Sequence, residues 1–168
     1  MNRNAPILET DRLILRPISL EDYPGYARIM QSSRAIHMGG PLGPRETWGM
    51  FCHCVASWDL FGHGALMIER RELPGAIGMV SINDGPLFVE KELGWFLYDG
   101  YEGHGFATEA AAALKDWAFT ELRVATLVSY FDPQNVKSLA VARRLGGVQD
   151  FEAEVSDPGD LVFRYDRP

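Results

Sequence analysis

The sequence predicts one mixed α/β domain spanning residues 1–168. Three observations lead to this prediction. The length of 168 residues suits a single domain, and an apolar share of 46% is ample for a packed core. Runs that alternate or are rich in β-branched residues follow one another with runs of helical period. Strands and helices in this order describe a mixed α/β sheet.

The first half of the chain contains three predicted strands and two predicted helices. Residues 8–17 alternate between apolar and polar side chains, as a strand does. A capping-box pattern that begins at Ser19 predicts the first helix, and Pro44 is placed to open the second. Further strands are predicted at residues 65–70 and 76–83, on either side of a Pro-Gly hairpin turn.

The second half is organised around residues 92–119, which read as a strand, a glycine-rich turn and a helix in direct succession. This stretch begins with an aromatic and aliphatic run typical of a buried strand. After Gly105, alanine, leucine and tryptophan recur at helical spacing. A strand at residues 124–131, a helix that starts at Asn135 and a strand at 161–165 complete the order.

Composition excludes several classes of protein. A net charge of −7 argues against a nucleic-acid-binding face, which needs clustered lysine and arginine. No apolar run approaches the ~20 residues of a membrane span, and residues 1–6 lack the apolar stretch of a secretory signal. Cys52 and Cys54 are too close together for an ordinary disulfide framework. We therefore expect a cytoplasmic protein that binds neither nucleic acid nor membrane.

The glycine-rich turn is suited to binding an anion. Gly103 and Gly105 lack a Cβ, so backbone N–H groups can turn inward just before a helix N-terminus. Such a turn can hold a phosphate or pyrophosphate, and a tight turn without a ligand fits the pattern equally well. No Walker loop string occurs, and Thr108 stands where a dinucleotide fingerprint needs glycine or alanine.

Three motifs together resemble the GNAT acetyltransferases of the RimJ/RimL branch. Residues 101–110 resemble the acetyl-CoA motif Q/R-x-x-G-x-G/A, with Glu102 in the place of glutamine or arginine. Residues 135–146 resemble the N-x-x-S…K-L-G-F helix, and Gly147 replaces the phenylalanine, which removes one packing contact. Residues 8–17 resemble the N-terminal strand of that branch. The motifs occur in the family's order, and the similarity spans nearly the whole chain.

The resemblance implies a fold and an activity. The fold would be a central mixed, mostly antiparallel, twisted sheet flanked by helices. The activity would be acetyl transfer from acetyl-CoA to a primary amine, by direct attack in a ternary complex. The acceptor would be a protein N-terminal α-amine or a small-molecule amine, and a homodimer is compatible with the family. A noncatalytic CoA-binding or sensor domain and a module for a different nucleotide stay open as other interpretations.

The resemblance also implies where the cofactor would bind. Backbone amides of the glycine-rich turn would hold the pyrophosphate, with the motif's first residue and a hydroxyl nearby. The residues in question are Glu102, Gly103, His104, Gly105, Phe106, Ala107 and Thr108. The pantetheine arm would pair with the preceding strand through Phe96, Leu97 and Tyr98, and Asn135 would support it.

A carboxylate near this strand is the candidate general base. Strand alternation places Glu92 on one face with Gly94 and Phe96. Members of the family often use a glutamate on this strand, directly or through water. A strand end that faces solvent is the other interpretation of Glu92.

A strong general acid and a metal site are both absent from the predicted chemistry. Ala142 stands where many relatives carry tyrosine, so Ser138 becomes the candidate to hydrogen-bond the leaving sulfur. Local capping of their own helix is the other interpretation of Asn135 and Ser138. The run at residues 52–54 alternates cysteine and histidine within one predicted helix, where successive side chains point apart, so we expect no metal.

Overall fold

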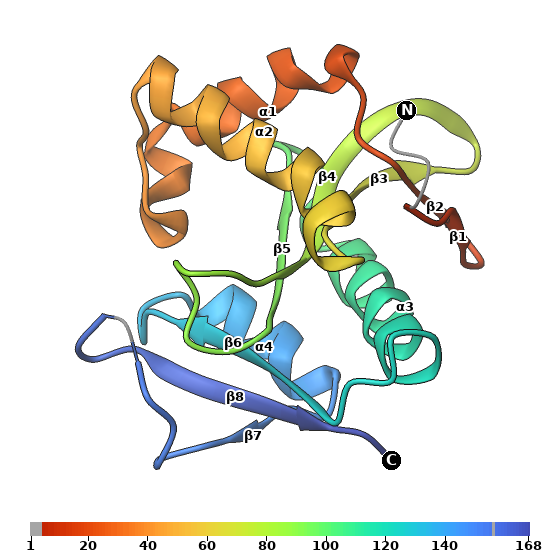
Figure 1. Cartoon of the computed structure of the whole chain (residues 1–168). Coiled ribbons are helices and arrows are strands. Elements are labelled where there is room, and N and C mark those ends of the chain that lie inside the picture. The colour runs from red at the N-terminus through yellow and green to blue at the C-terminus, as the bar shows by residue number, and fades with distance from the viewer. Residues whose placement is uncertain (1–4, 156) are drawn as a thin grey trace.

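The computed structural model describes residues 5–155 and 157–168, and in these residues a single eight-stranded sheet runs through the molecule (Figure 1). The strands are β1 (Leu8–Glu9), β2 (Leu13–Arg16), β3 (Ala65–Arg70), β4 (Leu73–Asn83), β5 (Glu92–Leu97), β6 (Thr126–Phe131), β7 (Val148–Gln149) and β8 (Leu161–Asp166). The α-helices are α1 (Tyr23–Met30), α2 (Pro44–Phe61), α3 (Phe106–Thr120) and α4 (Val136–Arg144). Two short 3₁₀ helices, η1 (Leu20–Asp22) and η2 (Ser33–Met38), flank α1.

The strand order in the sheet is β1-β2-β3-β4-β5-β6-β8-β7. All neighbours are antiparallel except β5 and β6, which are parallel. This confirms the mixed, mostly antiparallel sheet that the resemblance implies. The parallel pair is possible because α3 crosses over between the ends of β5 and β6.

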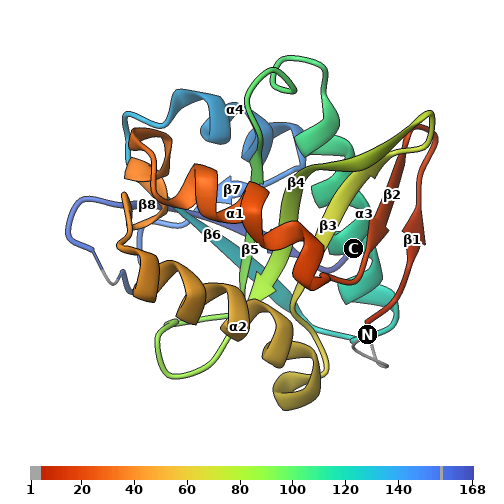
Figure 2. The same cartoon turned by 90° about the horizontal axis from the view of Figure 1, so that it is seen from above.

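Helices cover the two faces of the sheet, and each face has its own core. On one face α3 packs with α4, and small side chains such as Ala110 and Ala111 let α3 approach β4 and β5 closely. On the other face α1 and α2 pack side by side over β3 and β4, around Tyr26, Phe51 and Met79 (Figure 2). Alternate residues of the central strands therefore face different cores, as the period of two requires.

The parallel strands β5 and β6 separate soon after they meet. They pair at Glu92 and Val128, where the Val128 amide also donates to the Lys91 carbonyl over 3.0 Å. Beyond this point β5 continues beside β4, while β6 continues beside β8, and the two strands diverge (Figure 1). The sheet therefore opens in its middle, and its two halves become the walls of a cleft.

The predicted elements appear in the predicted order, with local differences. Residues 8–17 form two short antiparallel strands joined by a turn, because the Thr10 hydroxyl and amide both bond to Leu13. The capping box at Ser19 opens η1, which leads into α1. β7 is only two residues long, so no alternation could reveal it in the sequence.

The structure shows what lies beside Gly147, where the family motif has phenylalanine. A Cβ added at Gly147 would lie 2.7 Å from Cε1 of Tyr165 and 3.0 Å from the Ala142 carbonyl oxygen. The Tyr165 ring, which is buried in the main core, already occupies the space beside the glycine. Glycine at this position therefore accommodates a tyrosine from β8.

Candidate functional site

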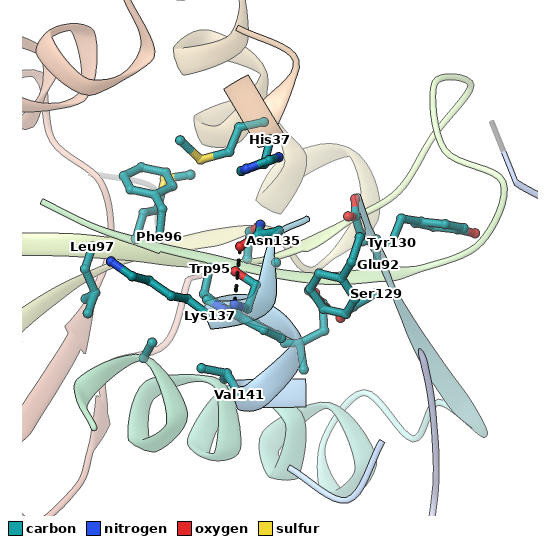
Figure 3. Close-up of a pocket in the computed structure, with 18 of the residues that line it drawn as sticks. His37, Glu92, Trp95, Phe96, Leu97, Ser129, Tyr130, Asn135, Lys137 and Val141 are labelled. Carbon is teal, nitrogen blue, oxygen red and sulfur yellow. Dashed lines mark hydrogen bonds between the residues drawn. The ribbon is translucent and has the colours of Figure 1, made fainter. Parts of the chain in front are cut away.

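A cleft of about 1760 Å³ occupies the opening between β5 and β6. Side chains and backbone from η2, β5, β6, α3 and α4 converge on it (Figure 3). Most of the residues expected to act in catalysis or cofactor binding line this cleft. They are Glu92, Phe96, Leu97, Glu102, Gly103, His104, Gly105, Ala107, Thr108, Asn135 and Ser138.

The glycine-rich turn leads into α3 through two left-handed residues. Gly103 and Gly105 both have φ of +81°, a conformation that side chains disfavour. Gly105 is the N-cap of α3, and the first helical bond runs from the Glu109 amide to the Gly105 carbonyl. The amides of Phe106, Ala107 and Thr108 therefore have no acceptor within the helix. This end of the cleft is suited to an anion.

Residues near the N-terminus hold the glycine-rich turn from behind. The Glu109 carboxylate accepts a hydrogen bond from the Thr10 hydroxyl at 2.6 Å and pairs with the Arg12 guanidinium at 2.6 Å. Arg12 also donates to the His104 carbonyl at 3.0 Å and lies over the Phe106 ring. Burial alone would raise the pKa of Glu109, but these hydrogen bonds lower it below its ordinary value. The turn is thus held in shape by contacts between residues that lie 97 positions apart in the sequence.

These contacts of Thr10 and Arg12 with Glu109 lead to a first prediction. Replacing Glu109 by glutamine should weaken binding of CoA, the cofactor that the resemblance implies, about tenfold, because the glycine-rich turn loses its charged hydrogen bonds to Arg12. Isothermal titration with CoA measures the change, and Thr120→Ala, at the far end of α3, is the matched control. Unchanged affinity in Glu109→Gln would show that the turn holds its shape without the charged contact between Glu109 and Arg12.

Glu102, which departs from the family motif, is paired with an arginine from another part of the chain. Arg34 on η2 forms ion pairs with Glu102 and with Asp99, the latter at 2.5 Å. Glu102 also accepts a hydrogen bond from the Gly100 amide at 3.1 Å. Both Arg34 and Glu102 line the cleft. The negative charge at the motif's first position is therefore compensated locally, beside the anion-binding end.

The backbone of β5 has one side paired and one side open to the cleft. The Tyr98 amide donates to the Ile77 carbonyl at 2.8 Å, so the register of β4 and β5 turns the Phe96 backbone toward β4 as well. The backbone groups of Leu97 and Trp95 alternate with those of Phe96 and Tyr98. They face the open side of β5, from which β6 has diverged. This corrects the expectation for the backbone groups of Phe96 and Tyr98, and it adds Trp95, which the sequence did not single out.

Glu92 lies deep in the cleft, at the point where β5 and β6 meet (Figure 3). Its carboxylate accepts a hydrogen bond from the Asn83 side chain at 3.2 Å. Burial raises the pKa of Glu92 above its ordinary value, and the negative charge of Asp160 adds to the rise. Hydrogen bonds from Asn83 and from the Tyr130 amide act in the opposite direction without cancelling it. A carboxylate with a raised pKa is a stronger base than an ordinary carboxylate.

Asn135 and Ser138 lie at the start of α4, on the wall opposite β5. The Asn135 side chain accepts a hydrogen bond from the Ser138 amide at 3.3 Å, so it caps the helix (Figure 3). Both residues also line the cleft, so capping and ligand binding are compatible. The Asn135 amide nitrogen and the Ser138 hydroxyl are the groups that a ligand would contact.

Two of the residues expected in the site have side chains elsewhere. Phe106 is buried in the core beneath the glycine-rich turn, so only its backbone amide belongs to the anion-binding end. The Tyr98 side chain lies against α1, and its hydroxyl would be 3.1 Å from a Cβ added at Gly25. Neither side chain lines the cleft.

Several cleft residues escaped the sequence analysis. Lys137 of α4 and Arg34 of η2 bring positive charge to the cleft. His37 of η2 lines the cleft, and its ring lies 3.3 Å from the Asp132 carboxylate. The glycine-rich turn has a local pattern that reveals it, whereas these side chains reach the cleft only through the tertiary fold.

In residues 5–155 and 157–168, no three histidine, cysteine, aspartate or glutamate side chains gather to hold a metal ion. Within the same part of the chain, no helix is both long enough and apolar enough to cross a membrane.

Comparison with known proteins gives one family and many similar structures. The family described as "Acetyltransferase (GNAT) domain" matches residues 12–148. The crystal structure of an acetyltransferase from Agrobacterium tumefaciens is 56% identical, with a TM-score of 0.94 over 96% of this chain and 94% of that one. A ribosomal L7/L12 α-N-protein acetyltransferase, RimL, in complex with CoA has a TM-score of 0.76 at 19% identity. That likeness covers 96% of this chain and 98% of RimL, and it shows a shared fold.

A curated relative matches over a shorter stretch. The uncharacterized N-acetyltransferase YnaD of Bacillus subtilis is 31% identical over 55 residues, which cover 33% of this chain. The matched stretch spans 32% of the length of YnaD.

Proposed function

The chain belongs to the GNAT acetyltransferase family, and from this premise we propose that it transfers the acetyl group of acetyl-CoA to a primary amine. The residues 1–168 would act as one domain, and the transfer would be a direct attack in a ternary complex. One observation carries the proposal: a single cleft joins an open helix N-terminus to the half-buried carboxylate of Glu92. The first suits the pyrophosphate of a cofactor, and the second suits proton removal from an amine.

The two walls of the cleft supply the cofactor contacts. Free amides at the start of α3 would bind the pyrophosphate, with the Thr108 hydroxyl beside them. The open backbone edge of β5 at Trp95 and Leu97 would pair with the amide groups of the pantetheine arm, like an added strand. Asn135 and Ser138 would contact the arm from α4. RimL, which shares this fold, is known in complex with CoA, and this supports the assignment.

The same residues would carry out the chemistry. Glu92 takes a proton from the attacking amine, whose nitrogen forms a bond to the thioester carbonyl carbon. A backbone N–H on the open edge of β5 stabilises the oxyanion that develops. The carbon–sulfur bond then breaks, and the Ser138 hydroxyl donates a hydrogen bond to the departing thiolate. A thiolate of this kind leaves without a strong acid, because a thiol that resembles that of cysteine has a pKa of ~8.5.

A covalent acetyl-enzyme is disfavoured by the state of the cleft cysteine. Cys54 lines the cleft, and burial raises the pKa of its thiol to about 12. Only a negligible fraction of the thiol is ionised near pH 7, so it is a poor nucleophile. This supports direct attack of the amine on the thioester.

The acceptor would be an α-amine of a protein N-terminus or a small-molecule amine. An α-amine with a reference pKa of ~7.7–8.0 is partly neutral at pH 7, whereas an alkylamine like that of lysine, at ~10.4, is almost entirely protonated. The second kind of acceptor depends more on Glu92.

The test is release of free thiol from acetyl-CoA in the presence of a panel of amines. We expect Ser138→Ala to lower kcat on the order of tenfold, because one hydrogen bond to a charged group is lost. Glu72→Ala in the exposed β3–β4 turn is the control and should change nothing. CoA binding without any thiol release would instead indicate a noncatalytic CoA-binding domain, and displacement of CoA by ATP or NAD would indicate another nucleotide.

Asn135 allows its two roles to be separated by a pair of variants. Asn135→Ser keeps a good N-cap but lacks the side-chain amide, whereas Asn135→Ala lacks both. We expect both variants to raise KM for acetyl-CoA about equally, while only Asn135→Ala destabilises the protein, by about 1 kcal/mol. Thermal unfolding and steady-state kinetics measure the two effects. A normal KM in Asn135→Ser would show that Asn135 serves only as a cap.

A further inference from the structure

The cleft has two chemically different ends. Its cofactor end is rich in glycine, free amides and the basic side chains of α4. Its other end lies beneath α1 and α2 and belongs to the second core. Apolar and aromatic residues of that core line it, among them Tyr26, Ile29, Met30, Met50, Met79 and Phe96. The end of the cleft opposite the cofactor end, where the acceptor would bind, is therefore lined mostly by apolar side chains.

Small residues of β4 and β5 form the floor of the cleft between Glu92 and this apolar end. Phe96 pairs with Met79, Gly94 with Ser81 and Glu92 with Asn83, so these pairs share one face of the sheet. Gly94 has no side chain and lies midway between Glu92 and Phe96. A Cβ there would be 3.2 Å from the Ser81 hydroxyl and 3.4 Å from the Asn83 amide nitrogen. Ser81 and Asn83 therefore already fill the space beside the glycine, and these small residues form the cleft floor between the Glu92 carboxylate and the apolar Phe96. We call the part of the cleft above this floor the hollow.

Polar partners in the hollow suffice for one amino group. The Glu92 carboxylate lies at one end of it, the Ser81 hydroxyl lies beside Gly94 in its middle, and both residues line the cleft. The acidic side chains Asp157 and Asp160 also line the cleft, from the loop before β8. Asp160 is close enough to Glu92 to affect its pKa, so these two carboxylates belong to the entrance on the Glu92 side. They can attract an ammonium ion toward Glu92 without placing charge at Phe96.

We propose that the acceptor is a primary monoamine whose amino group is attached to a compact apolar body. The amino group would lie at Glu92, and the apolar body would occupy the hollow over Gly94, against Phe96 and Met79. This inference rests on the proposed acetyl transfer and narrows its acceptor. Methionine and aromatic side chains adapt to apolar bodies of different shape.

Polyamines and aminoglycosides fit this end of the cleft poorly. Each would bring a second ammonium or several hydroxyl groups against Met30, Met79 and Phe96. Polar groups that lose water without gaining a hydrogen bond are costly, and an unpaired charge is the most costly of all. A site built in this way rejects such acceptors by far more than the loss of a methylene group would.

The test compares two amines with the same carbon chain, pentylamine and cadaverine. They differ only in the second ammonium group of cadaverine. We expect kcat/KM for pentylamine to exceed that for cadaverine by about 100-fold. Equal values, or a preference for cadaverine, would overturn the inference and leave acetyl transfer itself intact.

A variant that changes the charge of the apolar end sharpens the test. Met50→Glu places a carboxylate on α2 above the hollow, so kcat/KM should fall about tenfold for pentylamine and rise about tenfold for cadaverine. Leu60→Glu adds the same charge to the same helix at an exposed position outside the cleft and is the matched control. A Met50→Glu variant that behaves like Leu60→Glu would also overturn the inference.

Two further arms separate the source of the amine from failure of the proposed reaction. Short peptides that begin with leucine or with serine test whether the apolar body is a first side chain, and a preference for serine would count against the inference. If CoA binds but no amine releases thiol, the proposed acetyl transfer fails. Titration of both amines into the CoA-loaded protein then decides the preference, and tighter binding of cadaverine would overturn it.

Discussion

Replacement of Glu92 by glutamine is expected to lower kcat/KM for an alkylamine acceptor by about 10²- to 10³-fold. Glutamine keeps the shape of the side chain and can still accept the hydrogen bond from Asn83. It cannot take a proton from an ammonium ion, so the substitution isolates the role of the base. Steady-state thiol release measures the loss, and Glu72→Gln in the exposed β3–β4 turn is the control for charge alone.

The pH profile distinguishes a base from a merely structural group. Only the ionised Glu92 can accept a proton, and its pKa lies above the ordinary value because of burial and Asp160. The kcat/KM of the unsubstituted protein should therefore rise with pH through that raised pKa. The Glu92→Gln variant should lack this rise. A profile shared by both proteins would show that Glu92 is not the base.

The same substitution should stabilise the fold near neutral pH. Because its pKa is raised by folding, Glu92 binds its proton more tightly in the folded than in the unfolded chain. Its contribution to stability therefore falls as pH increases from the unfolded pKa of ~4.3 through the folded one. Thermal unfolding should give Glu92→Gln a higher Tm than the unsubstituted protein at pH 7, and the difference should vanish in acid. A lower Tm at pH 7 would contradict the burial argument.

Local patterns in the sequence were enough to predict the centre of the molecule. The strand, turn and helix at residues 92–119 follow from an aromatic run, paired glycines and helical periodicity, and all three appear as β5, the glycine-rich turn and α3. Glycine at positions 103 and 105 indicates a left-handed backbone conformation, because few other residues adopt that conformation. The open amides before α3 then follow from the geometry of any helix start.

The parts of the site that the sequence did not predict depend on contacts between distant segments. Arg34 meets Glu102 across 68 residues, and Thr10 meets Glu109 across 99. The register of β5 with β4 determines which backbone groups of β5 face the cleft. In the observed register these are the groups of Leu97 and not those of its neighbours. A shift of one residue would exchange the two sets of backbone groups, and no local pattern fixes that register.

The register of β4 and β5 also leads to the prediction with the largest effect on stability. Gly78 lies opposite Leu97, and a Cβ added there would be 2.3 Å from the Phe96 carbonyl oxygen and 2.9 Å from the Leu97 Cα. Both are backbone atoms, so no side chain can move aside to make room. Gly78→Ala should therefore destabilise the protein by about 3 kcal/mol and lower Tm by roughly 6–12 °C.

Gly78→Ala should impair catalysis as well, because the strand that must move carries the open backbone edge at Trp95 and Leu97. A displacement of about 1 Å at a reacting group can cost on the order of 10²-fold in rate. Gly49→Ala is the matched control: it lies in α2 with nothing within 4 Å of an added Cβ, and it should stabilise the helix by about 0.5–1 kcal/mol. Chemical denaturation and thiol release measured on both variants check the pair. If Gly78→Ala matched Gly49→Ala in either measurement, β4 and β5 could not be as closely apposed as their register requires.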